Sequence, residues 1–520
     1  MKLPLLDTII VLVYLAGVFA LAQWVSREKA GHEKTAKDYF LASKSLPWWA
    51  IGASLIAANI SAEQIIGMSG SGYALGLAIA SYEWMAAATL LVVGKFFLPI
   101  FLRNGIYTMP QFLQERYGNR IRTLMAVFWL GLYVFVNLTS IVWLGSLAVA
   151  QVTGMDQMLA LALLGLFALA YQLYGGLKAV ALTDIVQVAL LVLGGLMVAG
   201  LTLGKIGDGA GVLAGFNKLM ATHPDHFKMI LSPDNPHYKD LPGIGVLLGG
   251  LWVMHVSYWG FNQYIIQRAL AAKDLREAQK GIVFAAALKI ILPVIVVLPG
   301  IAALMLAPGL QRSDDAYPAM MSLLPSGVLG LVFAALVAAI VASLASKINS
   351  VATIFTLDFY AKYRPQASEK QLVRIGRIAA AVSIVIAIVT ARPLIGGFDQ
   401  GFQYIQEYTG FFTPGIVVIF VLGLFWKRAN EAGALAAALG SFLLSLALKF
   451  AWPELPFVNR VGVVFLLAAA LAVIVSLMTP SGAGRDRIQG DGVSFATSPS
   501  FNVAAVGVLA ILIALYALFW

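Results

Sequence analysis

The chain has no cysteine and little charge, and both absences narrow its function. None of the 520 residues is Cys, which excludes a disulfide framework, a thiolate metal site and a catalytic thiol. Only 12% of the residues are charged and 60% are hydrophobic, whereas soluble domains have about 25% charged residues. A soluble protein needs polar groups to cover its surface. The composition therefore predicts a chain solvated mostly by lipid.

Common enzyme motifs are also missing. The sequence contains no His-Glu-x-x-His, no Gly-x-Ser-x-Gly and no P-loop. The Gly-rich stretch 67–72 matches no phosphate-binding pattern and favours close helix packing instead. The net charge of +10 would suggest nucleic acid only if the basic residues formed one soluble face. They lie in short loops, so we expect neither catalysis nor nucleic-acid binding.

Long apolar runs separated by polar or Gly/Pro breaks predict about fourteen membrane spans. The first run could be a signal peptide, but it is long enough to span and has a single Lys before it, so we expect a retained helix. The expected spans are 5–25, 46–72, 78–102, 121–151, 156–174, 178–203, 241–266, 281–306, 326–360, 375–391, 402–426, 431–451, 461–479 and 500–519.

The basic residues predict the orientation of these spans. With the N-terminus outside, the cytoplasmic loops hold 23 of the 35 Lys and Arg residues, and the opposite loops hold 8. Half of those 8 lie in the long loop 204–240, and long loops cross the membrane regardless of charge. The positive-inside rule therefore predicts that both termini are outside, with the short link at Lys178 cytoplasmic.

Two spans carry polar residues and glycines in mid-span, which predicts broken helices. Asn59 to Gln64 interrupts the second span, and His255 to Gln263 interrupts the seventh. Five spans separate their starts, so the second block of five would be inverted relative to the first, the arrangement typical of transporters. The expected divisions are an extra N-terminal helix and cytoplasmic loop (1–45), a first repeat (46–203), an extracellular loop (204–240), a second repeat (241–426) and three C-terminal helices (427–520).

Polar side chains from several spans suggest a site for a small polyhydroxylated solute. Ionisable groups within a membrane are costly and are functional by default. A sugar needs donors and acceptors from several directions, and aromatic rings for its C–H faces. The polar candidates are Gln64, Glu83, His255, Lys289 and Gln406, and the adjoining aromatics are Tyr82, Tyr258, Trp259, Phe402 and Tyr404. The alternative is a buried structural Glu83–Lys289 ion pair with ordinary aromatic packing.

The ninth span suggests an ion site and also an obstacle to it. Its hydroxyls, including Ser343, and carbonyls freed at the break near Ala57 and Ile60 are the hard ligands that a cation needs. Lys347 lies one helical turn from Ser343. An ammonium about 6 Å from sodium would repel it by roughly 3 kcal/mol at an effective dielectric near 20. Alternatively, Lys347 reaches the cytoplasmic interface or pairs with Asp184.

Five groups of residues form recognisable motifs along the chain. They are Ala57-Ala58-Asn59-Ile60-Ser61-Ala62-Glu63-Gln64, Ser81-Tyr82-Glu83-Trp84, Tyr174-Gly175-Gly176-Leu177 with Thr183-Asp184, Tyr258-Trp259-Gly260-Phe261-Asn262-Gln263, and Gln403-Tyr404-Ile405-Gln406-Glu407-Tyr408. Together they resemble the sodium:solute symporter family, and most closely its bacterial sodium/galactose cotransporters in the sodium/glucose cotransporter group. The resemblance covers nearly the whole chain in order.

The resemblance implies an all-α, LeuT-type fold of fourteen helices around a five-plus-five inverted repeat, with sugar bound near mid-membrane. Implied sugar ligands are Gln64, Glu83, Lys289 and Gln406, and we add His255, Trp259 and Asn262 as substrate-binding candidates. Tyr258 is implied as the inner gate, and Met68, Tyr82 and Phe402 as outer gates. An implied sodium site uses carbonyls of Ala57, Ile60 and Ala339 and the hydroxyl of Ser343, with Asp184 nearby.

The chain departs from the family pattern in both sites. In the sugar shell, Ala86 stands where the galactose transporter has Ser, and His255 where it has Asn. In the ion site, a pair of hydroxyls is reduced to Ala342-Ser343, and Lys347 replaces an uncharged residue. The sequence therefore predicts a multi-pass protein of the cell membrane (a bacterial plasma or inner membrane) that couples sodium to monosaccharide uptake by alternating access.

Three alternative interpretations remain. The first is a sodium-independent or proton-linked carrier in which Lys347 substitutes for sodium. A membrane sugar sensor usually has a soluble output domain, and the loops here are short. A carboxylate or amino-acid substrate would use Lys289, but Glu83 beside it favours a neutral solute. The sugar's identity and the oligomeric state are not predicted.

Overall fold

The fold is described from a computed structural model covering residues 3–26, 46–106, 108–480 and 492–520; within this range the side chains of 22–23, 25–26, 174–185 and 369 are not described. The described residues form helices and turns, with one isolated β-bridge between Leu46 and Ala272 and no strand. This confirms the all-α prediction. The predicted cytoplasmic loop 27–45 lies outside the described residues, and at the predicted link the side chain of Lys178 is not described.

A helix, or a set of broken helices, lies at each predicted span. The first half of the chain contains α1 (Leu5–Ser26), α3 (Trp48–Asn59), η2 (Glu63–Gly67), α4 (Met68–Leu75), η3 (Gly76–Ala80), α5 (Ser81–Val92), η4 (Val93–Phe97), α6 (Leu98–Arg103), α7 (Met109–Arg116), α8 (Asn119–Gly131), η5 (Leu132–Leu138), α9 (Thr139–Thr153), α10 (Gln157–Ile206), α11 (Val212–Thr222) and η6 (Pro224–Phe227). The predicted spans 156–174 and 178–203 both fall within α10.

The second half continues in the same way. It contains α12 (Ile244–Leu248), α13 (Leu251–Val256), η7 (Ser257–Phe261), α14 (Gln263–Leu270), α15 (Leu275–Leu306), η8 (Ser313–Asp315), α16 (Ala316–Met321), α17 (Val328–Thr353), η9 (Ile354–Tyr360), α18 (Ala361–Tyr363), α19 (Glu369–Ile395), α20 (Gly401–Thr409), α21 (Thr413–Phe425), α22 (Glu431–Ala451), α23 (Phe457–Met478) and α24 (Pro499–Leu518).

Fewer helices qualify individually as membrane spans than the sequence predicts. Among the described residues, nine are long and apolar enough to cross a bilayer, or ten if the bent pair α20–α21 is one span. Broken helices account for part of the difference from fourteen. The second span is divided into α3 and the segment after it, and the seventh into α13 and α14, and such half-helices are too short to cross a bilayer alone.

Both predicted breaks are present. The first helix ends at Asn59, and Ile60 is extended (φ −71°, ψ 106°) before the chain turns into η2. Ser61 satisfies one freed backbone group, because its hydroxyl accepts the Glu63 N–H at 3.2 Å. The seventh span breaks at Asn262, which is also extended (φ −83°, ψ 121°). A third irregularity, which the sequence analysis did not predict, is a 46° bend between α20 and α21.

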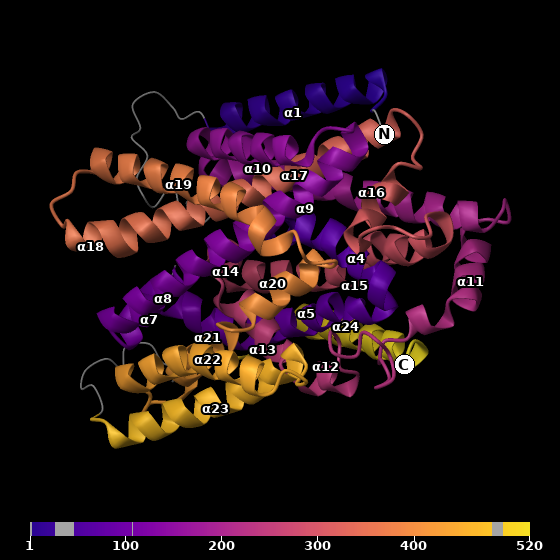
Figure 1. Cartoon of the computed structure of the whole chain (residues 1–520). Coiled ribbons are helices and arrows are strands. Elements are labelled where there is room, and N and C mark those ends of the chain that lie inside the picture. The colour runs from indigo at the N-terminus through magenta and orange to yellow at the C-terminus, as the bar shows by residue number, and fades with distance from the viewer. Residues whose placement is uncertain (1–2, 27–45, 107, 481–491) are drawn as a thin grey trace.

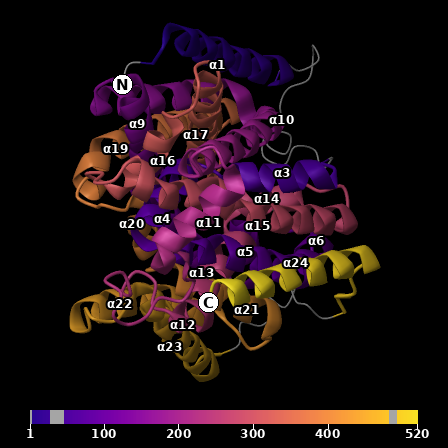
Figure 2. The same cartoon turned by 90° about the vertical axis from the view of Figure 1, so that its right-hand side faces the viewer.

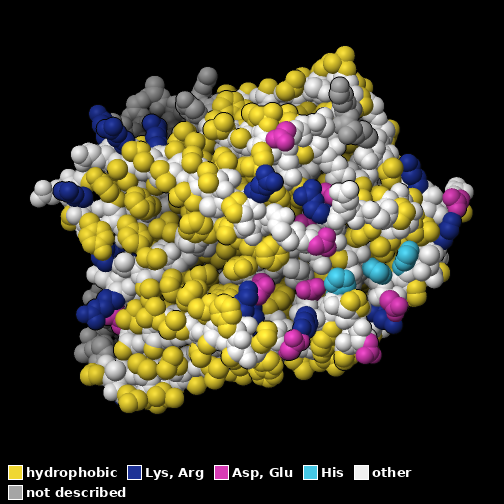
Figure 3. Space-filling view, viewed as in Figure 1, with side chains coloured by type: hydrophobic (Ala, Val, Ile, Leu, Met, Phe, Trp, Pro, Cys, Tyr) yellow, Lys and Arg dark blue, Asp and Glu magenta, His cyan; other side chains and the backbone are white. Residues whose placement is uncertain are grey.

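The elements predicted to lie on opposite sides of the membrane lie at opposite ends of the molecule. In Figure 1, α7 and α18 are at the left and α11 is at the right, with the start of α1 and the C-terminus also toward the right. Figure 2 shows α1 at one edge, beside α10, and α23 at the opposite edge. Figure 3 shows hydrophobic side chains over most of the face seen; Lys and Arg lie at the left-hand edge and also in the centre and at the right, where Asp, Glu and His accompany them.

Candidate functional site

A cavity of about 80 Å³ lies among the broken helices. A single water needs about 10–15 Å³ by this measure, so the cavity holds several waters or a small solute. All eight predicted substrate-binding residues line it, namely Gln64, Glu83, His255, Tyr258, Trp259, Asn262, Lys289 and Gln406. They come from η2, α5, α13, η7, the break after η7, α15 and α20. The fold thus brings together residues that are more than 340 positions apart in sequence.

A buried ion pair forms one wall of the cavity. The Lys289 ammonium lies 2.5 Å from a Glu83 carboxylate oxygen, and the two side chains are 1% and 2% exposed. Lys289 also donates to Oδ1 of Asn59 and lies 5.0 Å from the centre of the Trp259 ring. The structural pair considered in the sequence analysis is therefore present. Because both residues also face the cavity, the pair presents charge-assisted partners to a ligand.

Two of the three predicted outer gates contact each other at the cavity. The Tyr82 and Phe402 rings meet edge to face at 5.0 Å, and Tyr82 lies 6.1 Å from the His255 ring. Both Tyr82 and Phe402 line the cavity. Met68 is fully buried but does not line it. Nothing in the geometry therefore connects Met68 directly with a ligand in this cavity.

The predicted inner gate, Tyr258, is held by hydrogen bonds at its hydroxyl. Tyr264 donates to this oxygen at 2.8 Å, and Nδ2 of Asn59 donates to it at 3.2 Å. The Tyr258 ring also meets the Trp259 ring at 5.1 Å and 78°. These contacts join α3, η7 and α14, so the tyrosine connects the two broken spans.

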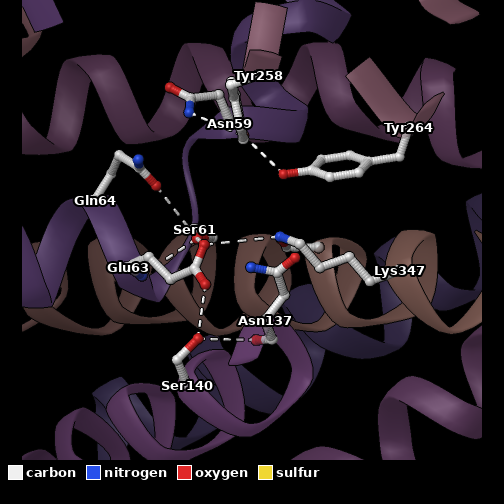
Figure 4. Close-up of polar contacts among 10 residues, drawn as sticks. Asn59, Ser61, Glu63, Gln64, Asn137, Ser140, Tyr258, Tyr264 and Lys347 are labelled. Carbon is white, nitrogen blue, oxygen red and sulfur yellow. Dashed lines mark hydrogen bonds and ion pairs between the residues drawn. The ribbon is translucent and has the colours of Figure 1, made fainter. Parts of the chain in front are cut away.

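A second buried ion pair lies at the first helix break (Figure 4). The Lys347 ammonium lies 3.7 Å from Oε2 of Glu63, with side chains 2% and 9% exposed. Oε1 of Glu63 accepts a hydrogen bond from the Ser140 hydroxyl at 2.7 Å. Lys347 also lies 3.4 Å from the Ser343 hydroxyl and 4.8 Å from the centre of the Tyr264 ring. Lys347 is therefore buried. The alternative interpretation of the sequence, in which Lys347 reaches the cytoplasmic interface, does not fit this position.

One residue of the expected sodium site, Ser343, contacts this second pair. Ile60 is the extended residue at the break, and Ser343 is 4% exposed on the packed face of α17. Ala339 lies one turn earlier on α17, and Ala57 lies in the last turn of α3. None of these four residues lines the described cavity. The Asp184 side chain lies outside the described residues.

Several cavity residues are absent from the predicted substrate site. Asn59, Glu63, Asn137, Thr409 and Thr413 all line the cavity. Asn59 and Glu63 belong to the polar break that the sequence does show. The two threonines flank the α20–α21 bend, and the available signal was the polar pair Gln406-Glu407 followed by Gly410 and Pro414. Asn137 lies close to Thr139 and Ser140 in the fourth span, a stretch that the sequence analysis does not single out.

Polar groups without partners face the cavity. Within the described residues, the Tyr82 hydroxyl, Nε2 of His255 and the hydroxyls of Thr409 and Thr413 are buried and make no hydrogen bond. Buried polar groups are nearly always hydrogen-bonded, and each exception needs an explanation. A ligand bearing several hydroxyls would satisfy these groups, because each hydroxyl both donates and accepts.

Comparison with known proteins gives a consistent result. The profile described as "Sodium:solute symporter family" matches residues 39–440. A sodium/glucose cotransporter of Vibrio parahaemolyticus is 51% identical over 539 aligned residues, covering 100% of this chain and 99% of that protein. The sodium/myo-inositol cotransporter 2 of Homo sapiens is 34% identical over 471 residues, covering 85% and 69%.

A solved structure shares the fold. A sodium-coupled sialic acid symporter in a substrate-bound, outward-open state matches with a TM-score of 0.78 and 22% identity, covering 92% of this chain and 99% of that one. At 22% identity, the match shows only that the two proteins share a fold. The full-length relative and the family profile carry the assignment further: the chain belongs to the sodium:solute symporter family.

Proposed function

We propose that this chain carries a monosaccharide across the cell membrane by alternating access, coupled to the inward movement of sodium. The observation that carries the proposal is the single cavity lined by all eight predicted sugar ligands. The unpartnered hydroxyls and the imidazole nitrogen around it favour a neutral, polyhydroxylated solute. The name of the 51% identical relative, a sodium/glucose cotransporter, supports the same substrate class.

In this proposal the two broken spans supply the moving parts. Sodium would bind among the carbonyls of Ala57, Ile60 and Ala339 and the Ser343 hydroxyl. It would hold α3 against α17 and favour the outward-open state that takes up sugar. Coupling then follows from a different ion affinity in the two states. Tyr82 and Phe402 would close over the sugar from outside, and Tyr258 would release it inside. Met68 is proposed as the third outer gate.

A second candidate is favoured by one observation. The Lys347 ammonium is 3.4 Å from Ser343, the one hydroxyl of the expected sodium site. In this version Lys347 takes the role of the cation, and the carrier is sodium-independent or proton-linked. The Glu63 carboxylate at 3.7 Å weakens the argument, because it offsets much of the repulsion between Lys347 and a bound sodium.

Sugar uptake into proteoliposomes tests both candidates. We expect a sodium gradient to drive accumulation of radiolabelled glucose or galactose above the equilibrium level. Uptake that ignores sodium but rises with an acid-outside gradient would instead support the second candidate.

The matched variants replace one glutamate each. Glu83→Gln should abolish sugar binding because it removes the carboxylate that faces the cavity. Glu454→Gln, an exposed carboxylate paired with Lys239, should change nothing. Equal sugar binding by both variants would contradict the sugar assignment, and thermal unfolding of each variant confirms that it is folded.

A further inference from the structure

Two ion pairs in the described structure have both side chains at least nine-tenths buried, and both touch the cavity. Lys289–Glu83 lies on the proposed sugar side, and Lys347–Glu63 lies at the helix break on the proposed ion side. Glu63, Glu83 and Lys289 line the cavity. Burying charge in this way is costly and marks a functional site by default. A change in the charges at one pair would affect the other most directly if contacts connect the two pairs.

A continuous set of contacts joins the two pairs, and Figure 4 shows the part that includes Lys347, Tyr264, Tyr258 and Asn59. The Lys347 ammonium lies 4.8 Å from the centre of the Tyr264 ring. The Tyr264 hydroxyl donates to the Tyr258 hydroxyl at 2.8 Å, and Asn59 donates to the same oxygen at 3.2 Å. Asn59 in turn accepts a hydrogen bond from Lys289. This relay therefore runs from α17 through α14, η7 and α3 to α15, and it crosses both helix breaks.

The two ends of the relay are held differently. Lys289 is fixed by a carboxylate at 2.5 Å, by Asn59 and by the Trp259 ring. Lys347 has a carboxylate at 3.7 Å and a hydroxyl at 3.4 Å, both longer than a normal charge-assisted hydrogen bond. A cation arriving beside Ser343 would therefore displace Lys347 more readily than Lys289. Tyr264 packs against the ammonium that would move.

We propose that Tyr264 is a positioning residue that couples the ion site to the sugar site. Its ring senses the place of the Lys347 ammonium, and its hydroxyl fixes the Tyr258 hydroxyl and, through it, Asn59. The inference rests on the proposed function and adds Tyr264, which lines the cavity but is not among the predicted sugar ligands. It holds whether sodium or a proton is the coupling ion, because both change the electrostatics at Lys347 and Glu63.

Tyr264→Phe tests the role of the Tyr264 hydroxyl separately from that of its ring. The ring that faces Lys347 remains, and only the hydroxyl that donates to Tyr258 is lost. The matched control is Tyr117→Phe, since the buried Tyr117 hydroxyl donates to the Ile419 carbonyl at 2.6 Å and does not line the cavity. Binding of radiolabelled sugar is measured in sodium and in choline chloride, and at acid and neutral pH. Coupling is the ratio of the two dissociation constants.

We expect the wild type and Tyr117→Phe to show the same ratio, of about tenfold or more, and Tyr264→Phe to lower it to about twofold with ion-free sugar affinity largely kept. An unchanged ratio in Tyr264→Phe would overturn the inference. So would a wild type that binds sugar with an affinity insensitive to both sodium and pH. A wild type that binds no sugar at all would instead contradict the proposed function.

A second variant tests the other end of the relay. Lys347→Met removes the ammonium while Tyr264 stays intact, and we expect the double variant Lys347→Met/Tyr264→Phe to lose no more coupling than the larger of the two single effects. Strictly additive losses would mean that the two residues act independently, and would overturn the relay. Thermal unfolding checks that each variant is folded, and Lys347→Met still gives a result if Tyr264→Phe is unstable.

Discussion

At the scale of single residues, Lys289 and Lys347 are both buried and paired with a glutamate, but their other contacts differ. Lys289 has a short ion pair, an amide acceptor and an indole face. Lys347 has Glu63, whose second oxygen is already used by Ser140, and a distant hydroxyl. Breaking a buried pair leaves an uncompensated charge, whereas removing both partners can be nearly neutral. Comparing single and double substitutions can therefore test the Glu63–Lys347 pair.

Removing either partner of this pair should destabilise the protein. We expect Glu63→Gln and Lys347→Met each to cost about 3–5 kcal/mol, because each leaves one charge buried alone. The double variant should lose clearly less than the sum of the two. The two variants should have opposite effects on sodium: Lys347→Met raises its apparent affinity and Glu63→Gln lowers it. Thermal unfolding in detergent and the sodium dependence of uptake measure both effects.

The control is a more exposed pair of the same type. Arg122 and Asp358 lie 2.5 Å apart, and the Arg122 side chain is 25% exposed. Asp358→Asn should leave the sodium dependence of uptake at the wild-type value. If the Glu63 and Lys347 variants behave like this control toward sodium, their pair is purely structural.

The sequence identified Lys347 as unusual but did not reveal its partner. Position along a helix predicts which residues share a face, so the contact with Ser343 one turn away could be predicted. Glu63 lies on a different span, just past a break that redirects the chain. The direction of a side chain after an irregular turn depends on the backbone angles at Ile60 and Ser61, which no periodicity specifies. From the sequence alone, Lys347 could therefore be assigned to the cytoplasmic interface or to a pair with Asp184, but not to Glu63.

At the scale of elements, breaks are predictable where polar residues and glycines coincide. Asn59 to Gln64 and the stretch around Asn262 contain both signals, and both produce broken helices. The α20–α21 bend carries the same two signals, polar Gln406 and Glu407 followed by Gly410, but the sequence analysis does not predict it. Short π-helical segments such as η5 were also missed, because they differ from an α-helix by a single backbone register and leave no sequence period of their own.

Gly70 shows why one element needs a residue without a side chain. A Cβ at this position in α4 would collide with the backbone and carboxylate of Asp314 in η8. The same carboxylate accepts the Gly401 N–H at 2.7 Å, so η8 joins α4 to the start of α20. We expect Gly70→Ala to force these elements apart and to cost about 1–3 kcal/mol, the usual penalty of overpacking. A lower unfolding temperature with the same helical content would be the observation.

Gly131 provides the matched control for this substitution. It lies in α8, and a Cβ there would meet nothing within 4 Å. Ala is the better helix former, so Gly131→Ala should be neutral or stabilising by up to about 1 kcal/mol. Equal destabilisation by the two substitutions would show that the contact with Asp314 does not explain the effect at Gly70.

At the scale of the whole molecule, charge, helix direction and the ends of the chain agree with one another. The α7 and α18 segments lie at one end of the molecule, where several Lys and Arg side chains are exposed, and α11 and the C-terminus lie at the other. The arrangement of the elements fixes which of them share a side. It does not by itself decide which side faces the cytoplasm, because that depends on insertion and the positive-inside rule. We propose that both termini are outside.

The absence of cysteine allows this orientation to be tested without removing native thiols. Lys218 in α11 and Lys362 in α18 are both exposed, and they lie at opposite ends of the molecule. In right-side-out vesicles, a membrane-impermeant maleimide should label Lys218→Cys at once and Lys362→Cys only after permeabilisation. The unmodified chain is the blank. The reverse pattern would invert the proposed orientation while leaving the fold intact. Labelling of both positions from the same side would contradict the membrane arrangement itself, because the helices between these two ends must then fail to cross the bilayer.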